Sequence, residues 1–407
     1  MHILYFHQHF ATPRGSLGTR SYQIAKRLVE NGHTVTMVCG SSLGSAIGID
    51  TPYKNGLRRG IVDGIQVVEL DLVYTNRDGF LKRTNTFLKY AFRSVRLAMT
   101  ERYDIVFATT TPLTAGIPGI AARWLKRKPF VFEVRDLWPE IPKSMGVITN
   151  PIVLLLMSWL EWATYHSAHR LIGLSPGIVE GIKKRGIQAD NVTLVPNGCD
   201  LSIFSDSDSS QRPAGVTDEQ LMAVYTGTHG MANGLDSVIN VARELKSRNR
   251  KDIKLVLVGD GKLKDELVAT AEKEELANIV FHPPVSKMEI AGLMKSADLG
   301  MQILSNIPAF YYGTSPNKFF DYIASGLPVL INYPGWLADM IKENNCGFTV
   351  DPDDPVAFAN ALESAANDRS ELRKKGINAN ALAREDFDRI KLADKWCTWV
   401  TGVKKDK

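Results

Sequence analysis

The residues that most directly indicate chemistry lie in GTSPNKFFDYIASGLPVL, residues 313–330. The spacing of apolar residues predicts a helix with Ser315 as its N-cap, Pro316 as its first residue and Gly326 just beyond its end. Lys318 then falls in the first turn, where the helix dipole disfavours a cation. A bound anion would make a cation favourable at that place.

A phosphate suits this helix start, because the backbone amides of the first turn, Asn317 included, have no partner within the helix. Asp321 lies one turn after Lys318, so both side chains could face one ligand. A carboxylate there could accept hydrogen bonds from sugar hydroxyls. The alternative is a Lys318–Asp321 pair on a solvated surface.

Short apolar segments that are typical of strands alternate with helical segments along the chain. The strands are expected at residues 2–6, 34–39, 64–70, 104–109, 129–134 and 170–175, and then at 221–227, 254–260, 278–282, 299–304 and 328–332. This alternation predicts an α/β protein with two doubly wound, Rossmann-like domains whose parallel sheets face a central cleft.

We place the first domain at 1–200 and the second at 201–387, with a polar linker at 205–219. The terminal helix, about 388–407, either packs on the nearest core or crosses back onto the first domain. We expect it to cross back.

Two common cofactor motifs are absent from the sequence. The loop HQHFATPRGSLGTR has Gly15 and Gly18 but no GxGxxG, so a nicotinamide cofactor is not expected. A Walker lysine motif is absent too. Four scattered cysteines without a CxxC pair indicate a reducing compartment and no zinc site, and we identify no Asp-x-Asp cluster that would hold a metal.

Charge is distributed unevenly along the 407 residues. Residues 1–170 contain 21 Lys and Arg against 12 Asp and Glu, whereas the rest of the chain contains 28 against 32. A basic first domain favours a polyanionic partner, for which nucleic acid and anionic lipid both qualify.

One helical segment of the first domain has a basic face. Lys82, Lys89, Arg93 and Arg96 fall on one side of it, and Leu81, Leu88, Phe92 and Val95 line the adjacent side. This pattern predicts contact with an anionic membrane surface, with a solvated face over a core helix as the alternative. The apolar run 152–160 is too short to span a bilayer. It could add to the membrane contact, but we expect it to be buried in the core.

Several motifs, taken in order and spacing, resemble one enzyme family. They are the glycine-bearing loop 13–18, GHTV (32–35), SPGIVEGIKKRG (175–186), VPNGCD (195–200), YTGTHGMANGLD (225–236), LVGDGKLKDEL (257–267) and SADLG (296–300). Together they resemble the GT-B glycosyltransferases of family 4, which are retaining, nucleotide-sugar enzymes. The resemblance covers nearly the whole chain and implies a UDP-sugar co-substrate with no other cofactor.

The resemblance implies a donor site in the second domain. Its candidate residues are Gly227, Thr228, His229, Gly259, Gly261, His282, Ser315, Pro316, Asn317, Lys318 and Asp321. Asp321 matches the family residue that holds the ribose. The chain departs from the family at Gly313, which replaces a glutamate, and at Thr228 and Asn233, which replace two diphosphate-binding cations. We expect Lys318 to take over the diphosphate.

The acceptor side is expected in the first domain. EVRDLWPE (133–140) matches a place where many members carry a histidine–aspartate pair, here Arg135 and Asp136. Asp136 is the candidate for orienting a hydroxyl, with Glu140 second; the alternative is a helix-capping aspartate. The candidates for acceptor contacts are Arg14, Gly15, Gly18, Arg20 and Arg135.

DLWPE resembles the branch that builds bacterial O-antigen and capsule, including N-acetyl-L-fucosamine transferases. The expected function is transfer of an N-acetylated deoxyhexose from a UDP-sugar to a lipid-diphosphate-linked acceptor in lipopolysaccharide or capsule synthesis. The enzyme would act at the inner face of the cytoplasmic membrane as a peripheral protein, with no nucleic-acid partner. The alternatives are a UDP-sugar 2-epimerase and a non-catalytic nucleotide-sugar-binding protein.

Overall fold

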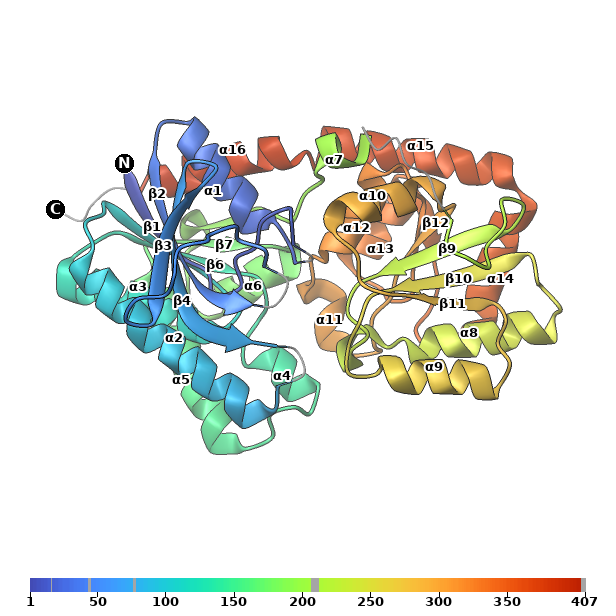
Figure 1. Cartoon of the computed structure of the whole chain (residues 1–407), viewed down its shortest axis with the longest axis horizontal. Helices are drawn as coiled ribbons and strands as arrows, with labels where there is room; N and C mark the ends of the chain where they lie inside the picture. Colours follow the sequence, from blue (N-terminus) through green and yellow to red (C-terminus); the bar gives the residue numbers. More distant parts are fainter. Residues whose placement is uncertain (16, 43–44, 76–77, 206–211, 404–407) are drawn as a thin grey trace. The chain divides into compact units, whose positions relative to one another are not determined.

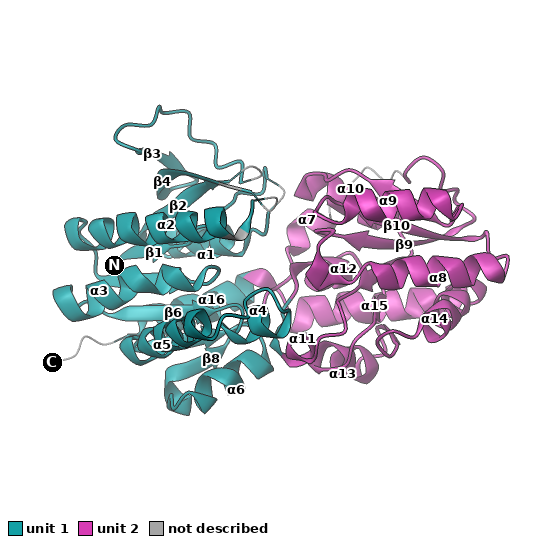
Figure 2. Cartoon of the chain, turned by 90° about the horizontal axis from the view of Figure 1, so that it is seen from below, with its two compact units in different colours: residues 1–196, 313–315, 390–407 teal, residues 197–312, 316–389 magenta. Residues whose placement is uncertain are grey.

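The computed structural model describes residues 1–15, 17–42, 45–75, 78–205 and 212–403. The chain forms two compact units, coloured separately in Figure 2. Unit 1 comprises residues 1–196, 313–315 and 390–407, and unit 2 comprises residues 197–312 and 316–389. The linker predicted at 205–219 lies within unit 2 and not at the boundary between the units, which the structure places at residue 196. Residues 206–211 of this linker lie outside the described residues.

Unit 1 is built on an eight-stranded sheet with the order β3-β4-β2-β1-β5-β6-β7-β8. Its strands are β1 (His2–Phe6), β2 (Thr34–Ser42), β3 (Leu57–Val62), β4 (Ile65–Tyr74), β5 (Ile105–Thr109), β6 (Phe130–Val134), β7 (Arg170–Gly173) and β8 (Val192–Leu194). All neighbours are parallel except the hairpin β3–β4. The central strands are runs of buried, mostly β-branched and aromatic residues, as expected for strands covered on both faces.

Helices cover both faces of this sheet (Figure 1). They are α1 (Arg20–Glu30), α2 (Phe80–Thr100), the 3₁₀ turn η1 (Leu113–Gly116), α3 (Ile117–Lys126), α4 (Glu140–Ser144), α5 (Pro151–Ser167), α6 (Pro176–Lys184), the 3₁₀ turn η2 (Ala189–Asn191) and α16 (Arg389–Thr401). One core contains side chains of α1 and α16, Trp396 among them, and the other contains side chains of α2, α3, α5 and α6.

Unit 2 has a parallel sheet with the order β11-β10-β9-β12-β13-β14. Its strands are β9 (Leu221–Thr226), β10 (Ile253–Val258), β11 (Ile279–His282), β12 (Leu299–Gln302), β13 (Val329–Ile331) and β14 (Gly347–Thr349). Its helices are α7 (Leu201–Ser205), η3 (Met231–Asn233), α8 (Asp236–Ser247), α9 (Lys264–Lys273), α10 (Lys287–Ser296), α11 (Pro308–Gly313), α12 (Asn317–Ala324), α13 (Trp336–Glu343), α14 (Pro355–Asn367) and α15 (Arg369–Glu385). The prediction of an α/β protein with two Rossmann-like domains is confirmed.

The strand orders locate one switch point in each sheet. Unit 1 changes direction between β1 and β5, and unit 2 changes direction between β9 and β12. Ligands of doubly wound sheets bind beyond the carboxyl ends of the strands at such points. The loops after β1, β5 and β6, and those after β9, β10 and β12, are therefore the places to examine.

The prediction that residues 152–160 are buried is wrong. They form the first part of α5, where Met157 and Leu160 pack half-buried against the core and Leu155, Leu156 and Trp159 are exposed. An apolar run does not by itself distinguish a core helix from one with an exposed apolar face.

A buried ion pair joins distant parts of unit 1. The guanidinium of Arg20 lies 2.8 Å from the carboxylate of Glu133, and it also donates to the carbonyl oxygens of Val195 and Pro196. Trp396 donates its indole N–H to the same carboxylate. Burial alone would raise the pKa of Glu133, but the charge and hydrogen bonds of Arg20 hold it below its ordinary value.

We expect Arg20→Met to destabilise unit 1 by about 3–5 kcal/mol, because it leaves a buried carboxylate unpaired. The double variant Arg20→Met/Glu133→Gln should recover part of that loss. Six of the seven tryptophans lie in unit 1, so unfolding in urea followed by tryptophan fluorescence reports this unit. The matched control is Arg59→Met, since Arg59 pairs with Glu101 at an exposed position and should matter little. Equal effects of Arg20→Met and Arg59→Met would contradict this account.

Candidate functional site

Helix α12 begins one residue later than predicted. Pro316 occupies the N-cap position, and no side chain caps the helix, so the prediction of Ser315 as the N-cap is wrong. Proline cannot donate a backbone N–H, and its fixed φ suits the entry into a helix. Lys318 is therefore the second residue of α12, still within its first turn.

The ammonium of Lys318 lies beside the end of β9. It is 2.9 Å from the hydroxyl of Tyr225 and 3.2 Å from the side-chain oxygen of Asn233, and it sits 4.1 Å from the centre of the Tyr225 ring. Both hydrogen-bond partners are neutral. Tyr225 was not predicted, because an aromatic residue in a buried strand resembles any core residue.

Burial lowers the pKa of Lys318 to about 7, because the charged form loses hydration. An anion that approached its ammonium would favour the charged form and raise this pKa.

Glycines allow the backbone of two loops to pass close to Lys318 and to each other. Gly227 has φ +145, and a Cβ built on it would lie 3.1 Å from Lys318 Nζ. Gly259 has φ +146, and a Cβ there would lie 1.9 Å from the carbonyl oxygen of Gly227, so only glycine fits. The amide of Gly227 donates to Val258, which ties the two loops together. The backbone is therefore open to close approach by a ligand.

His229 lies under these loops with a fully buried ring. Neither ring nitrogen has a hydrogen-bond partner, and burial lowers its pKa to about 4, with the charge of Lys264 acting in the same direction. Its backbone amide donates to Asp260. Thr228, the residue before it, is exposed and offers its carbonyl oxygen to the Tyr225 hydroxyl.

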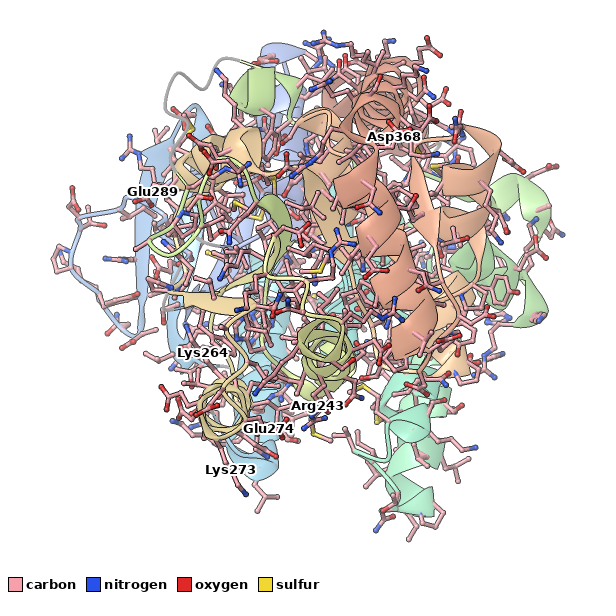
Figure 3. All side chains as sticks on the ribbon, turned by 90° about the vertical axis from the view of Figure 1, so that its right-hand side faces the viewer. Arg243, Lys264, Lys273, Glu274, Glu289 and Asp368 are labelled. Carbon is pink, nitrogen blue, oxygen red and sulfur yellow. The ribbon has the colours of Figure 1, made fainter. Side chains whose placement is uncertain are left out.

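Lys264 is a cation that the sequence analysis missed. It is the first residue of α9, and it donates to the carbonyl oxygens of Gly259 at 2.7 Å and His282 at 3.3 Å. Lys264 and Lys273 are the first and last residues of α9, and just beyond Lys273 the side chain of Glu274 pairs with Arg243 of α8 at 2.6 Å; both partners are labelled in Figure 3. This pair secures the outer end of α9, away from the glycine loops.

Asp321 does not share a partner with Lys318 in this structure. Its carboxylate lies 3.2 Å from Lys287, which also pairs with the buried Asp200, and Asp200 in turn pairs with Arg389. Burial raises the pKa of Asp321, and the charge of Lys287 opposes that rise. The alternative of a Lys318–Asp321 surface pair is wrong. A ribose contact by Asp321 stays a prediction, and it would compete with Lys287, a residue that sequence reasoning missed.

A second group of polar residues lies at the switch point of unit 1. Arg135 Nη1 is 3.2 Å from Nε2 of His7, and Asp136 accepts a hydrogen bond of 3.1 Å from the hydroxyl of Thr111. Burial raises the pKa of Asp136, while the hydrogen bond from Thr111 and the charge of Arg135 oppose the rise. Glu140 begins α4 and is exposed. Asp136 caps no helix here, so the capping alternative is wrong.

The remaining acceptor candidates differ in exposure and in whether their polar groups already have partners. Arg20 is buried, and Glu133 and the carbonyls described above occupy its guanidinium, so an acceptor contact by Arg20 is contradicted. Arg14 and Gly18 are exposed, whereas Gly15 is buried. The guanidinium of Arg14 approaches Gly48, which lines a pocket of about 340 Å³ at the ends of β2 and β4.

Comparisons with known proteins assign both units. Residues 15–198 match the family described as glycosyl transferase 4-like domain, and residues 206–382 match the family described as glycosyl transferases group 1. The chain belongs to the GT-B glycosyltransferases. A glycosyltransferase of Methanocaldococcus jannaschii is 22% identical over 365 residues, which cover 87% of this chain and 86% of the relative.

Solved GT-B structures share the fold over nearly the whole chain. HepE of Anabaena, in complex with UDP and glucose, superimposes with a TM-score of 0.71 at 16% identity, covering 99% of this chain and 100% of HepE. WaaG, a glycosyltransferase involved in lipopolysaccharide biosynthesis, gives 0.70 at 19% identity, covering 98% of this chain and 100% of WaaG.

The structure shows the surroundings of two positions, Asn233 and Gly313, at which the chain departs from the family pattern. Asn233 contributes a neutral amide to Lys318, at 3.2 Å. Gly313 ends α11, and a Cβ built on it would meet no atom within 4 Å. In the described part of the chain, no group of three or more His, Cys, Asp or Glu side chains could hold a metal ion.

We expect Lys318 to titrate near pH 7, about three units below an ordinary lysine. Reductive methylation of the lysines with ¹³C-labelled formaldehyde, followed by NMR across pH, should give one resonance with this midpoint. The resonance should be absent from Lys318→Ala and present in Lys251→Ala, which alters an exposed lysine of the same unit. If every resonance titrated above pH 9 or so, the desolvated environment of Lys318 would be refuted.

Proposed function

We propose that this glycosyltransferase uses a UDP-sugar and binds its diphosphate at the start of α12. The observation that carries the proposal is the environment of Lys318, a desolvated cation in the first helical turn whose partners Tyr225 and Asn233 are neutral. A diphosphate there would interact with the Lys318 ammonium, the dipole of α12 and the backbone amides of Asn317 and Lys318.

The rest of the donor site follows from the loops beside Lys318. The backbone of Gly227–Gly230 would complete the diphosphate contact, and Gly259, Gly261 and His282 would lie along the uracil. The ribose hydroxyls would donate hydrogen bonds to the carboxylate of Asp321 and would displace its ion pair with Lys287. The complex of HepE with UDP and glucose supports the choice of a uridine nucleotide.

The chemical step we propose is retaining and needs electrostatic stabilisation more than a protein nucleophile. Lys318 and the helix start would stabilise the charge that develops on the departing diphosphate, which itself helps to deprotonate the acceptor hydroxyl. Asp136 would orient a reacting hydroxyl, with Arg135 and Glu140 nearby in the sequence. The transferred group is an N-acetylated deoxyhexose in this proposal.

The acceptor we propose is a lipid-diphosphate-linked saccharide at the inner face of a bacterial cytoplasmic membrane. Arg14, Gly15 and Gly18 would contact it in unit 1. The role of WaaG in lipopolysaccharide biosynthesis supports a surface-polysaccharide pathway. The α2 residues Lys82, Lys89, Arg93 and Arg96 are all exposed, which supports contact with anionic lipid, although Lys82 also pairs with Asp78. No described helix is long and apolar enough to cross a membrane.

Calorimetric titration with UDP, GDP and ADP tests the donor site. We expect UDP to bind most tightly, and Lys318→Ala to weaken it at least tenfold, or about 1.4 kcal/mol, because the ammonium is lost. The advantage of the wild type over Lys318→Ala should shrink above pH 7 or so, as Lys318 loses its proton. Comparing the two proteins at each pH cancels the titration of UDP itself.

The matched control is Lys251→Ala, which removes an exposed lysine of unit 2 and should leave UDP binding unchanged. Equal affinities for UDP in the wild type and Lys318→Ala would contradict the proposed diphosphate site. Binding of none of the three diphosphates would contradict the proposed donor altogether.

Turnover tests the role of Asp136. We expect Asp136→Asn to slow UDP release from UDP-sugars at least about tenfold in the presence of a bacterial lipid extract, while UDP affinity stays unchanged. Glu140→Gln alters an exposed carboxylate close in sequence and should have a smaller effect. Conversion of a UDP-sugar to its epimer without lipid extract and without net release of UDP would favour the 2-epimerase. Neither UDP release nor epimerisation by the wild type with every UDP-sugar would favour the non-catalytic alternative.

A further inference from the structure

Helix α5 has apolar side chains on two sides. One side packs on the core of unit 1 through Met157, Leu160 and Tyr165. The other side faces outward, with exposed fractions between 50% and 69%; its residues are Ile152, Leu155, Leu156, Trp159 and Trp162. The outward side of a surface helix is normally polar in a water-soluble protein, so this second apolar side is unusual.

Specific contacts hold α5 in this orientation. The carboxylate of Glu161 lies 2.6 Å from the guanidinium of Arg185, and Tyr165 belongs to the core beneath the sheet. Thr164 packs against Gly116, where an added Cβ would lie 2.5 Å from it. Turning α5 to hide its apolar side would bury the leucines but break this ion pair and these contacts. The outward apolar side is therefore built into the fold.

The exposed apolar surface continues onto the neighbouring helix. Helix α3 packs against both α2 and α5, and all three lie on one face of the unit 1 sheet (Figures 1 and 2). Trp124 and Leu125 of α3 are exposed by 63% and 70%. We call these two residues and the five outward residues of α5 the apolar face. Contiguous apolar surfaces of this kind mark interaction sites.

The charged residues around the apolar face indicate which kind of partner it binds. Helices α2, α3 and α5 together contain seven Lys and Arg residues, and Glu161, buried and paired, is their only acidic residue. Lys89 and Arg96 of α2 are exposed, and Arg123 lies over the ring of Trp124. Apolar and tryptophan side chains bordered by cations fit the headgroup region of an anionic bilayer.

A second copy of the chain fits this surface less well. Dimers of identical chains commonly use the same patch on both partners, which would bring two cationic α2–α3 surfaces together without acidic residues to pair them. An anionic lipid surface supplies the opposite charge.

We propose that the apolar face of α5 and α3 inserts among the headgroups of an anionic membrane, with the basic side of α2 resting on the surface beside it. Helix α5, at 17 residues and lying across unit 1, would contact the interface and not span it. The inference concerns unit 1 only and does not depend on the donor site of unit 2.

Vesicle flotation tests this proposal with the full chain. Vesicles of phosphatidylcholine mixed with an equal amount of phosphatidylglycerol should carry the wild type upward, and vesicles of phosphatidylcholine alone should carry much less. We expect Leu155→Gln/Leu156→Gln and Trp159→Gln/Trp162→Gln each to weaken binding to the mixed vesicles at least about tenfold. All four side chains are exposed, so these changes should leave folding intact.

The matched control is Val356→Gln/Ile377→Gln, which changes two exposed apolar residues of unit 2 and should float like the wild type. Flotation of the α5 variants at wild-type level would overturn the proposal. So would a wild-type dimer, measured by light scattering, that the α5 variants turn into monomers while neither form floats. UDP calorimetry on the same variants should be unchanged, so a failure here is distinct from a failure of the donor site.

Discussion

The buried carboxylate of Glu133 is the interaction on which unit 1 depends. It stands at the end of a central strand, yet its partners come from the first helix, through Arg20, and from the last, through Trp396. Arg20 also binds the carbonyls of Val195 and Pro196, where the chain leaves unit 1. One carboxylate thus joins segments far apart in the sequence beside the switch point of the sheet.

In unit 2, some buried charges are paired with one another and one, Lys318, has only neutral partners. Asp321, Lys287, Asp200 and Arg389 balance one another within the protein, whereas Lys318 has neutral partners only. Asp321 and Lys318, three positions apart on α12, therefore lie in different environments. The charge of Asp321 is balanced within the protein, whereas that of Lys318 is open to a ligand. The open one adjoins the loops of Gly227 and Gly259, and it is there that we propose the donor binds.

The sequence predicted the long buried strands and the alternation of strand and helix, because both depend on local periodicity. It missed β3 and the three-residue strands β8 and β14, whose patterns are too mixed or too short to distinguish from loops. Glycine loops and Lys318 were visible as sequence patterns. The partners Tyr225, Lys287 and Glu133 were not, since each comes from a remote segment. The orientation of α5 was also hidden, because the contacts that hold it, such as that of Glu161 with Arg185, are made with remote segments.

The division of the chain has a consequence for its synthesis. Unit 2 occupies the interior of the sequence almost without interruption, whereas unit 1 needs both ends, and Trp396 fills part of its core. A ribosome delivers residues 197–389 before α16 emerges, so the nascent chain holds an incomplete first unit while the second can already close. During that interval the space later filled by Trp396 is open to water, and Glu133 lacks its indole partner. Completion of unit 1 thus waits until α16 has been translated.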